Sequence, residues 1–148
     1  PVAKTAAKQA IDEALKAKND EIDARTDLTD EEKAAAKSEA KAKADAVKEA
    51  IDNATTNAEV EQSKSTGTTE VKAVDPQPEA KTEAKQAIDD ALKAKTAEID
   101  ARTDLTDEEK ATAKADAKIK ADAANDAIDK ATTNAEVEQS KSTGTTEV

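Results

Sequence analysis

A single unit occurs twice in this chain, and most residues of the first copy recur 77 positions later, as Ile11 does at Ile88. Aligning residues 1–71 with residues 78–148 gives 13 differences and therefore 58 identities in 71 positions. Near-identical neighbours of this length are typical of tandem-repeat proteins, in which each repeat is one folding unit. The two copies must therefore adopt the same fold, and we expect an array of two equal modules.

Prolines mark the boundary between the two copies. Pro76 and Pro78 each disfavour a helical conformation in the residue that precedes them, so a helix is not expected to run through this segment. We therefore expect a first repeat at 1–74, a proline-containing junction at 75–78 and a second repeat at 79–148.

Each repeat contains three amphipathic segments. In the first segment, Ile11, Leu15 and Ile22 recur at spacings of four and seven, and in the second Val47 and Ile51 lie four apart among alanines. Apolar residues at these spacings line one face of a helix. The fold is predicted to be all-α, with two tandem three-helix bundles arranged end to end as an elongated rod. The expected helices are at about 4–24, 30–54 and 57–74 in the first repeat and at about 80–101, 107–131 and 134–148 in the second.

Two capping boxes predict where helices begin. Thr29 is followed three residues later by Glu32, and Thr56 is followed in the same way by Glu59. In this pattern the threonine hydroxyl accepts from the backbone of the glutamate, whose carboxylate accepts from the backbone of the threonine. Leu28 occupies the position before the first cap, where an apolar side chain packs back on the helix. Both signals favour ordered helices.

Gly67 is the weak point of the third predicted helix. It lies in the run Ser65–Thr69, which contains no strong helix former, and glycine alone costs about 1 kcal/mol relative to alanine. The apolar stripe resumes in register at Val71 and Val74, which favours a helix that is unbroken or kinked. A break at Gly67 remains the alternative at this point.

Composition limits the classes of function. The net charge is −11, which argues against binding to nucleic acid or to anionic membrane surfaces. The longest apolar runs are far too short to cross a bilayer, so membrane insertion is not expected. Only 18 of 148 residues are Val, Ile or Leu, and low aliphatic content with high net charge is typical of disorder. An intrinsically disordered linker is therefore a competing interpretation.

The chain is not expected to be an enzyme. It lacks His and Cys, so the usual pairs of nucleophile and base cannot be assembled. Neighbouring carboxylates such as Asp12–Glu13 and Asp89–Asp90 are interpreted as solvated faces, because acid–base work needs a carboxylate with a shifted pKa in a cleft. Asp12 is expected to pair with Lys16, one turn away on the same helix. We expect no catalytic, cofactor-binding or metal-binding residues and no cofactor.

Two motifs resemble ligand sites but favour a structural interpretation. Acidic residues cluster around the second helix start of each repeat, yet they lack the alternating ligands and central glycine of a calcium loop, so helix capping is favoured over metal binding. The run 64–69 has a lysine and a glycine but no strand before it, so a helix kink or turn is favoured over a phosphate loop. The acidic residues are Asp27, Asp30, Glu31 and Glu32 in the first repeat and Asp104, Asp107, Glu108 and Glu109 in the second.

Three positions stand out from their surroundings. Lys18 and its equivalent Lys95 fall on the apolar stripe of the first helix, where we expect the side-chain stem to be covered and the ammonium to reach water. Ile119 replaces an alanine on the outer face of the second helix, and an ordinary exposed isoleucine is favoured over a contact for a neighbour. Residues 53–55, Asn-Ala-Thr, match the N-glycosylation pattern, but Lys130 replaces the asparagine in the second repeat, so the match is treated as chance.

The order of these motifs resembles a known family. Ala-Ile-Asp followed by Lys-Ala-Lys, then Leu-Thr-Asp-Glu-Glu-Lys, then Ala-Ile-Asp-Asn-Ala-Thr-Thr-Asn-Ala-Glu-Val and a closing Gly-Thr-Thr-Glu-Val, resembles the domain-of-unknown-function 1542 repeat. The resemblance covers about 4–74 and 81–148. Its members are repeats of long, cell-wall-anchored surface proteins of Gram-positive bacteria, including staphylococcal adhesins. The family has no catalytic motif to map onto this chain.

The resemblance implies a stalk that holds a distal adhesive domain away from the cell wall. We therefore expect a monomeric, extracellular spacer whose partners are neighbouring repeats, with the secretion signal and wall anchor outside this sequence. The alternative is a three-helix module that binds a host plasma or matrix protein. Binding surfaces usually centre on aromatic residues, Met or Arg, and this chain has no aromatic residue, no Met and one Arg in each repeat.

Overall fold

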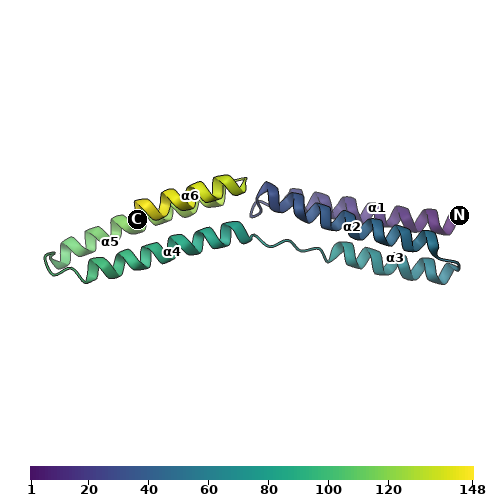
Figure 1. The fold of residues 1–148 in the computed structure, drawn as a ribbon, viewed down its shortest axis with the longest axis horizontal. Helices are drawn as coiled ribbons and strands as arrows, with labels where there is room; N and C mark the ends of the chain where they lie inside the picture. Colours follow the sequence, from purple (N-terminus) through teal and green to yellow (C-terminus); the bar gives the residue numbers. More distant parts are fainter. The chain divides into compact units, whose positions relative to one another are not determined.

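The computed structural model describes residues 1–148 and contains six α-helices and no strand (Figure 1). The all-α class and the two tandem three-helix bundles are therefore confirmed. The chain divides into two compact units, Pro1–Arg25 with Glu31–Gln77 and Thr26–Asp30 with Pro78–Val148. The helices are α1 Val2–Asp23, α2 Asp30–Asn53, α3 Asn57–Lys72, α4 Glu79–Asp100, α5 Asp107–Lys130 and α6 Asn134–Glu147.

Capping boxes start three of these helices. At α3, the Thr56 hydroxyl accepts from the Glu59 backbone N–H at 3.1 Å, and the Glu59 carboxylate accepts from the Thr56 backbone N–H at 3.1 Å. The same reciprocal pair begins α5 at Thr106 and Glu109, and α6 begins with the equivalent pair. These bonds satisfy backbone donors that a helix leaves unpaired at its first turn.

The core of the first unit is built from few large side chains and many alanines. Ile11 of α1, Ile51 of α2 and Val71 of α3 are each 0% exposed. Ala40 and Ala44 are equally buried on α2. Alanine contributes little apolar area, but it lets helices approach closely and loses no side-chain entropy on burial. The low aliphatic content is therefore compatible with an ordered bundle.

Gly67 lies inside α3 without interrupting it. A β-carbon built there would lie 2.3 Å from Cγ1 of Val47 and 2.8 Å from Cδ1 of Ile11. The glycine is therefore required by the close approach of α3 to its two neighbours. This explains why the helix continues through a residue of poor helix propensity: tertiary packing offsets the local cost.

The helix bounds differ from the expected ones by a few residues. The first helix begins at Val2 instead of residue 4, and α3 ends at Lys72 instead of residue 74. Beyond Lys72 the chain approaches Pro76, and the residue before a proline is disfavoured in a helix.

One core substitution distinguishes the two repeats and allows a prediction. Ala124 of α5 replaces Val47 of α2, and both residues are 7% exposed. Valine fits beside Gly67 in the first repeat, but a β-carbon at Gly144 would lie 2.5 Å from Cβ of Ala124, so α5 and α6 already meet at the alanine. We therefore expect Ala124→Val to overpack the second repeat and to lower its free energy of unfolding by about 1 kcal/mol. Chemical denaturation checks this expectation.

The control is Ala123→Val, at the exposed neighbouring residue. There the same change only lowers helix propensity and should cost a few tenths of a kcal/mol. A second repeat that is stabilised by Ala124→Val would mean that α5 and α6 can separate to the spacing found in the first repeat.

Candidate functional site: the polar network at the end of α1

The acidic clusters lie where helices begin. Asp30, Glu31 and Glu32 are the first three residues of α2, and their equivalents begin α5. Negative side chains at this end of a helix are stabilised by the helix dipole. No group of three or more acidic side chains in the chain is arranged to hold a metal ion.

Hydrogen bonds at the caps lower the pKa of the capping glutamates. The Thr55 backbone N–H has the largest effect on Glu59 and lowers its pKa below the ordinary value of 4.5. The Thr106 backbone N–H does the same for Glu109. Arg102 donates two hydrogen bonds to the Asp104 carboxylate, at 2.8 and 2.7 Å. These bonds lower the pKa of that carboxyl to about 2.

The lowered glutamate pKa values predict a loss of stability in acid. Because the folded pKa lies below the unfolded one, the contribution of the capping carboxylate is fully present above about pH 4.5 and is lost as the pH falls through the folded value. Removing this carboxylate with Glu59→Gln should therefore destabilise the protein at pH 7 and make much less difference at pH 2. Urea unfolding of both proteins at the two pH values measures this. A difference that is equal at pH 7 and pH 2 would mean that the ionised carboxylate does not stabilise the cap.

Pairs of lysines on one helix bind the C-terminal end of a neighbouring helix. Lys4 and Lys8 of α1 donate to Asp52 at the end of α2, Lys4 to its backbone carbonyl at 2.7 Å and Lys8 to its carboxylate at 2.8 Å. The Lys8 hydrogen bond lowers the pKa of Asp52. Positive charge at a helix C-terminus is favourable because the last carbonyls there are unpaired. The same arrangement recurs with Lys33 and Lys37 on Asp23, Lys81 and Lys85 on Asp129, and Lys110 and Lys114 on Asp100.

These lysine pairs were not predicted from the sequence. A signal was available, because in each case two lysines four residues apart face an Ile-Asp pair that ends another helix. The predicted pair within α1 is also replaced: Asp12 pairs with Lys48 of α2, and Lys16 lies 3.9 Å from Asp20. The lysine pairs and the Asp12–Lys48 ion pair each connect residues of different helices, so their proximity depends on how the helices pack.

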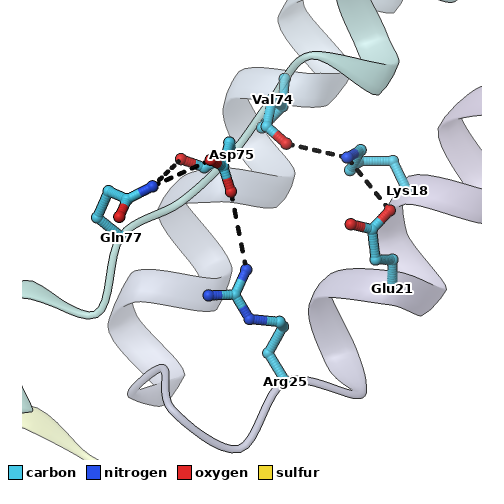
Figure 2. A network of polar contacts seen from close by, with 6 residues as sticks. All are labelled: Lys18, Glu21, Arg25, Val74, Asp75 and Gln77. Carbon is cyan, nitrogen blue, oxygen red and sulfur yellow. Dashed lines mark hydrogen bonds and ion pairs between the residues drawn. The ribbon is translucent and has the colours of Figure 1, made fainter.

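A buried lysine holds the segment that leaves the first repeat (Figure 2). Lys18 is 6% exposed, and its Nζ atom donates to the backbone carbonyl of Val74 at 3.0 Å. The same Nζ lies 3.2 Å from a carboxylate oxygen of Glu21. The expectation that the Lys18 ammonium reaches water is therefore wrong, because a backbone carbonyl from the end of the repeat covers it.

A second contact holds the same segment to α1. Arg25 lies 4.0 Å from the Asp75 carboxylate, and Gln77 donates to the other carboxylate oxygen of Asp75 at 3.1 Å (Figure 2). Together with the Lys18 bond, this contact attaches the segment Ala73–Gln77 to the C-terminal end of α1. We call this segment the exit segment and these contacts the exit network.

The equivalent lysine of the second repeat is more exposed. Lys95 has 36% of its side chain exposed and lies 3.3 Å from a carboxylate oxygen of Glu98. The stem of Lys95 is thus partly covered, and its ammonium meets the exposed carboxylate of Glu98. Arg102, which corresponds to Arg25, binds Asp104.

The remaining sequence candidates lie on helical surfaces or at helix ends. Ile119 is 67% exposed on α5, as an ordinary surface isoleucine would be. The lysine and glycine of the run 64–69 lie within the continuous helix α3, not in a loop that could hold phosphate. Asp90 accepts from Gln86 on its own helix at 3.1 Å. The glycosylation pattern at 53–55 coincides with the end of α2.

None of the six helices has an apolar stretch that would let it cross a membrane.

Comparison with known proteins gives one family and a consistent set of relatives. The family model described as Domain of Unknown Function (DUF1542) matches residues 3–79 and 80–148. "Extracellular matrix-binding protein EbhA" of Staphylococcus aureus strain Mu3 is 36% identical over 139 residues, which cover 94% of this chain and 2% of that protein. "Extracellular matrix-binding protein ebh" of strain USA300 is 34% identical over 141 residues, covering 95% of this chain and 1% of that protein. No solved structure matches.

The chain thus spans about 1–2% of the length of the curated relatives it matches. The two family matches coincide with the two copies seen in the sequence and with six helices of the expected order. The chain belongs to the DUF1542 family, as two tandem helical repeats of an extracellular Gram-positive surface protein.

Proposed function

We propose that this chain is a non-catalytic spacer, part of a stalk that projects a distal adhesive domain from a bacterial cell surface. The observation that carries the proposal is the exit network. Lys18 and Arg25 hold the segment that leaves the first repeat against α1, so the connection to the next repeat starts from a fixed point. A stalk needs such attachment, because a freely jointed connection would not keep its length.

The functional units would be the repeats 1–74 and 79–148, joined by the junction 75–78 and placed end to end. A 22-residue helix such as α1 is about 33 Å long at 1.5 Å per residue. Two bundles of this length with their junction would span on the order of 80–90 Å. Each added repeat would lengthen the stalk by the same increment.

A second candidate function comes from the relatives, which are named as extracellular matrix-binding proteins. In this function, the helical surface would bind a host matrix protein, and tandem copies would add avidity. Against it, the chain has no aromatic residue and no Met, and its two arginines already bind Asp75 and Asp104. These are the residue types on which binding surfaces usually depend.

A binding assay separates the two functions. The 148-residue chain is immobilised and exposed to soluble plasma and matrix proteins. The control is a chain of the same composition with its residues in scrambled order. The spacer function predicts no saturable binding beyond that of the control. A specific partner with a Kd in the micromolar range or tighter would contradict the pure spacer and support the binding module.

A further inference from the structure

The chain enters and leaves the first repeat at opposite ends of its bundle. Lys4, near the start of α1, binds the carbonyl of Asp52 at the end of α2, and α3 begins soon afterwards at Asn57. The starts of α1 and α3 therefore lie at the same end of the bundle. The exit segment lies at the other end, where the Val74 carbonyl accepts from Lys18 near the end of α1. Tension applied across this repeat is therefore directed along its helices.

If the exit segment were not attached to α1, this tension would act directly on the end of α3. α3 is poorly suited to bear it, because the run Ser65–Thr69 contains no strong helix former and includes Gly67. α1 consists mostly of alanine, lysine, glutamate and other good helix formers. The helix nearest to the junction is thus the one with the lower helix propensity.

The exit network offers a path for tension that avoids α3. It joins the exit segment to α1 at two points, through the 3.0 Å bond from Lys18 to Val74 and through Arg25, which lies 4.0 Å from Asp75 (Figure 2). Lys18 lies in the last turns of α1, and Arg25 follows the end of the helix. The exit segment therefore runs along the end of α1, in the direction in which the chain leaves the repeat.

Contacts arranged in this way resist tension together. A pull along the helix axis loads the Lys18 hydrogen bond and the Arg25 ion pair at the same time, so they are not opened one after the other. Burial adds to the resistance, because Lys18 is 6% exposed and Val74 is 3% exposed. Water has little access to compete for their hydrogen bond, and moving Val74 outward would expose apolar surface.

We propose that the exit network is a force-bearing clasp, which passes tension from the junction into α1 and keeps it off α3. Lys18 carries most of the load, and Arg25 adds a second, more exposed contact. While the clasp is closed, the exit segment pulls on α1, and when the clasp opens, tension reaches α3 and the repeat unfolds. This inference deepens the proposed spacer function and rests on it for the source of the tension.

A single-molecule pulling experiment tests the clasp by changing where the tension is applied. The chain has no cysteine, so two introduced cysteines can carry the handles at chosen exposed positions. In the first arrangement, Val2→Cys and Glu79→Cys apply tension across the exit segment. In the second, Val2→Cys and Lys72→Cys apply it to the end of α3 and leave the exit segment unloaded. The rate of unfolding at constant force is measured in each arrangement, with and without Lys18→Met.

We expect the effect of Lys18→Met to depend on the arrangement. When the chain is pulled across the exit segment, unfolding should become about tenfold faster, the change in rate that corresponds to one lost buried hydrogen bond. When it is pulled at the end of α3, the same substitution should change the rate much less, because the lost bond does not carry the load. A residue that only stabilises the fold would not produce this difference between the arrangements.

Two further variants make the result specific. Lys16→Met is the matched control, because Lys16 lies on the same helix, has 82% of its side chain exposed and is not part of the exit network. It should leave the rates in both arrangements unchanged. Asp75→Asn removes a charge from a side chain that is 74% exposed, so it does not disturb the core. It should speed unfolding in the first arrangement only, and by less than Lys18→Met.

An effect of Lys18→Met in the second arrangement that equals or exceeds its effect in the first would overturn the inference, because the network would then stabilise the repeat without bearing tension. An unchanged rate in the first arrangement would overturn it as well. The spacer proposal fails by a different result, a saturable host partner in the binding assay, so the two failures are distinguishable.

Discussion

Gly144→Ala is expected to lower the free energy of unfolding of the second repeat by about 2 kcal/mol, although alanine is the better helix former. A β-carbon at Gly144 would lie 2.5 Å from Cβ of Ala124 and 2.5 Å from Cδ1 of Ile88. The Ala124 atom cannot rotate away, so α6 must shift outward, and overpacking of this kind costs about 3 kcal/mol. The higher helix propensity of alanine offsets about 1 kcal/mol of this cost. Hydrogen exchange across α6 measures the difference.

Ser142→Ala provides the matched control on the same helix. Ser142 is exposed, so its replacement by alanine changes only helix propensity and should stabilise α6 by a few tenths of a kcal/mol. If Gly144→Ala also stabilised the repeat, the three helices would not approach as closely as the structure has them. Gly67→Ala in the first repeat should repeat the loss, since Val47 and Ile11 occupy the same space there.

Lys18→Met is expected to destabilise the end of the first repeat by about 1–2 kcal/mol. The change keeps the length and apolar character of the side chain but removes the donor to Val74, whose carbonyl belongs to a residue that is 3% exposed. A buried acceptor that loses its partner costs about 1–3 kcal/mol, and the methionine recovers part of this by packing. Amide exchange in the exit segment should become faster.

Lys95→Met is the control in the 148-residue chain. Lys95 is 36% exposed and lies beside Glu98, which is 65% exposed, so the pair contributes little. We expect its replacement to change stability by less than about 0.5 kcal/mol. Equal losses from Lys18→Met and Lys95→Met would mean that the Val74 hydrogen bond does not stabilise the exit segment.

Local sequence signals were sufficient to predict the helices. Thr56 with Glu59 begins α3 as its capping pattern predicts, and Ile11 and Ile51 lie in the core as their spacing predicts. These features depend on residues within a few positions of one another. The course of α3 through Gly67 was harder to predict, because it depends on contacts with Val47 and Ile11, which lie far away in the sequence.

The exit network could not be predicted for a related reason. Lys18 was recognisable as a charge on an apolar stripe, but its partner is the backbone carbonyl of Val74, 56 positions away. A backbone carbonyl has no sequence signature, so nothing in the composition of residues 72–77 identifies it as an acceptor. The same holds for the carbonyl of Asp52, which accepts from Lys4.

Small-angle X-ray scattering on the 148-residue chain, with the mass checked for a monomer, tests the spacer. Two bundles placed end to end predict a radius of gyration of about 25–28 Å, obtained by treating their summed length as a thin rod. A value of about 40 Å would indicate a disordered chain, and a value of about 15 Å a single globule in which the repeats fold onto each other. Either of these values would contradict the stalk, whereas an intermediate, rod-like profile would support it.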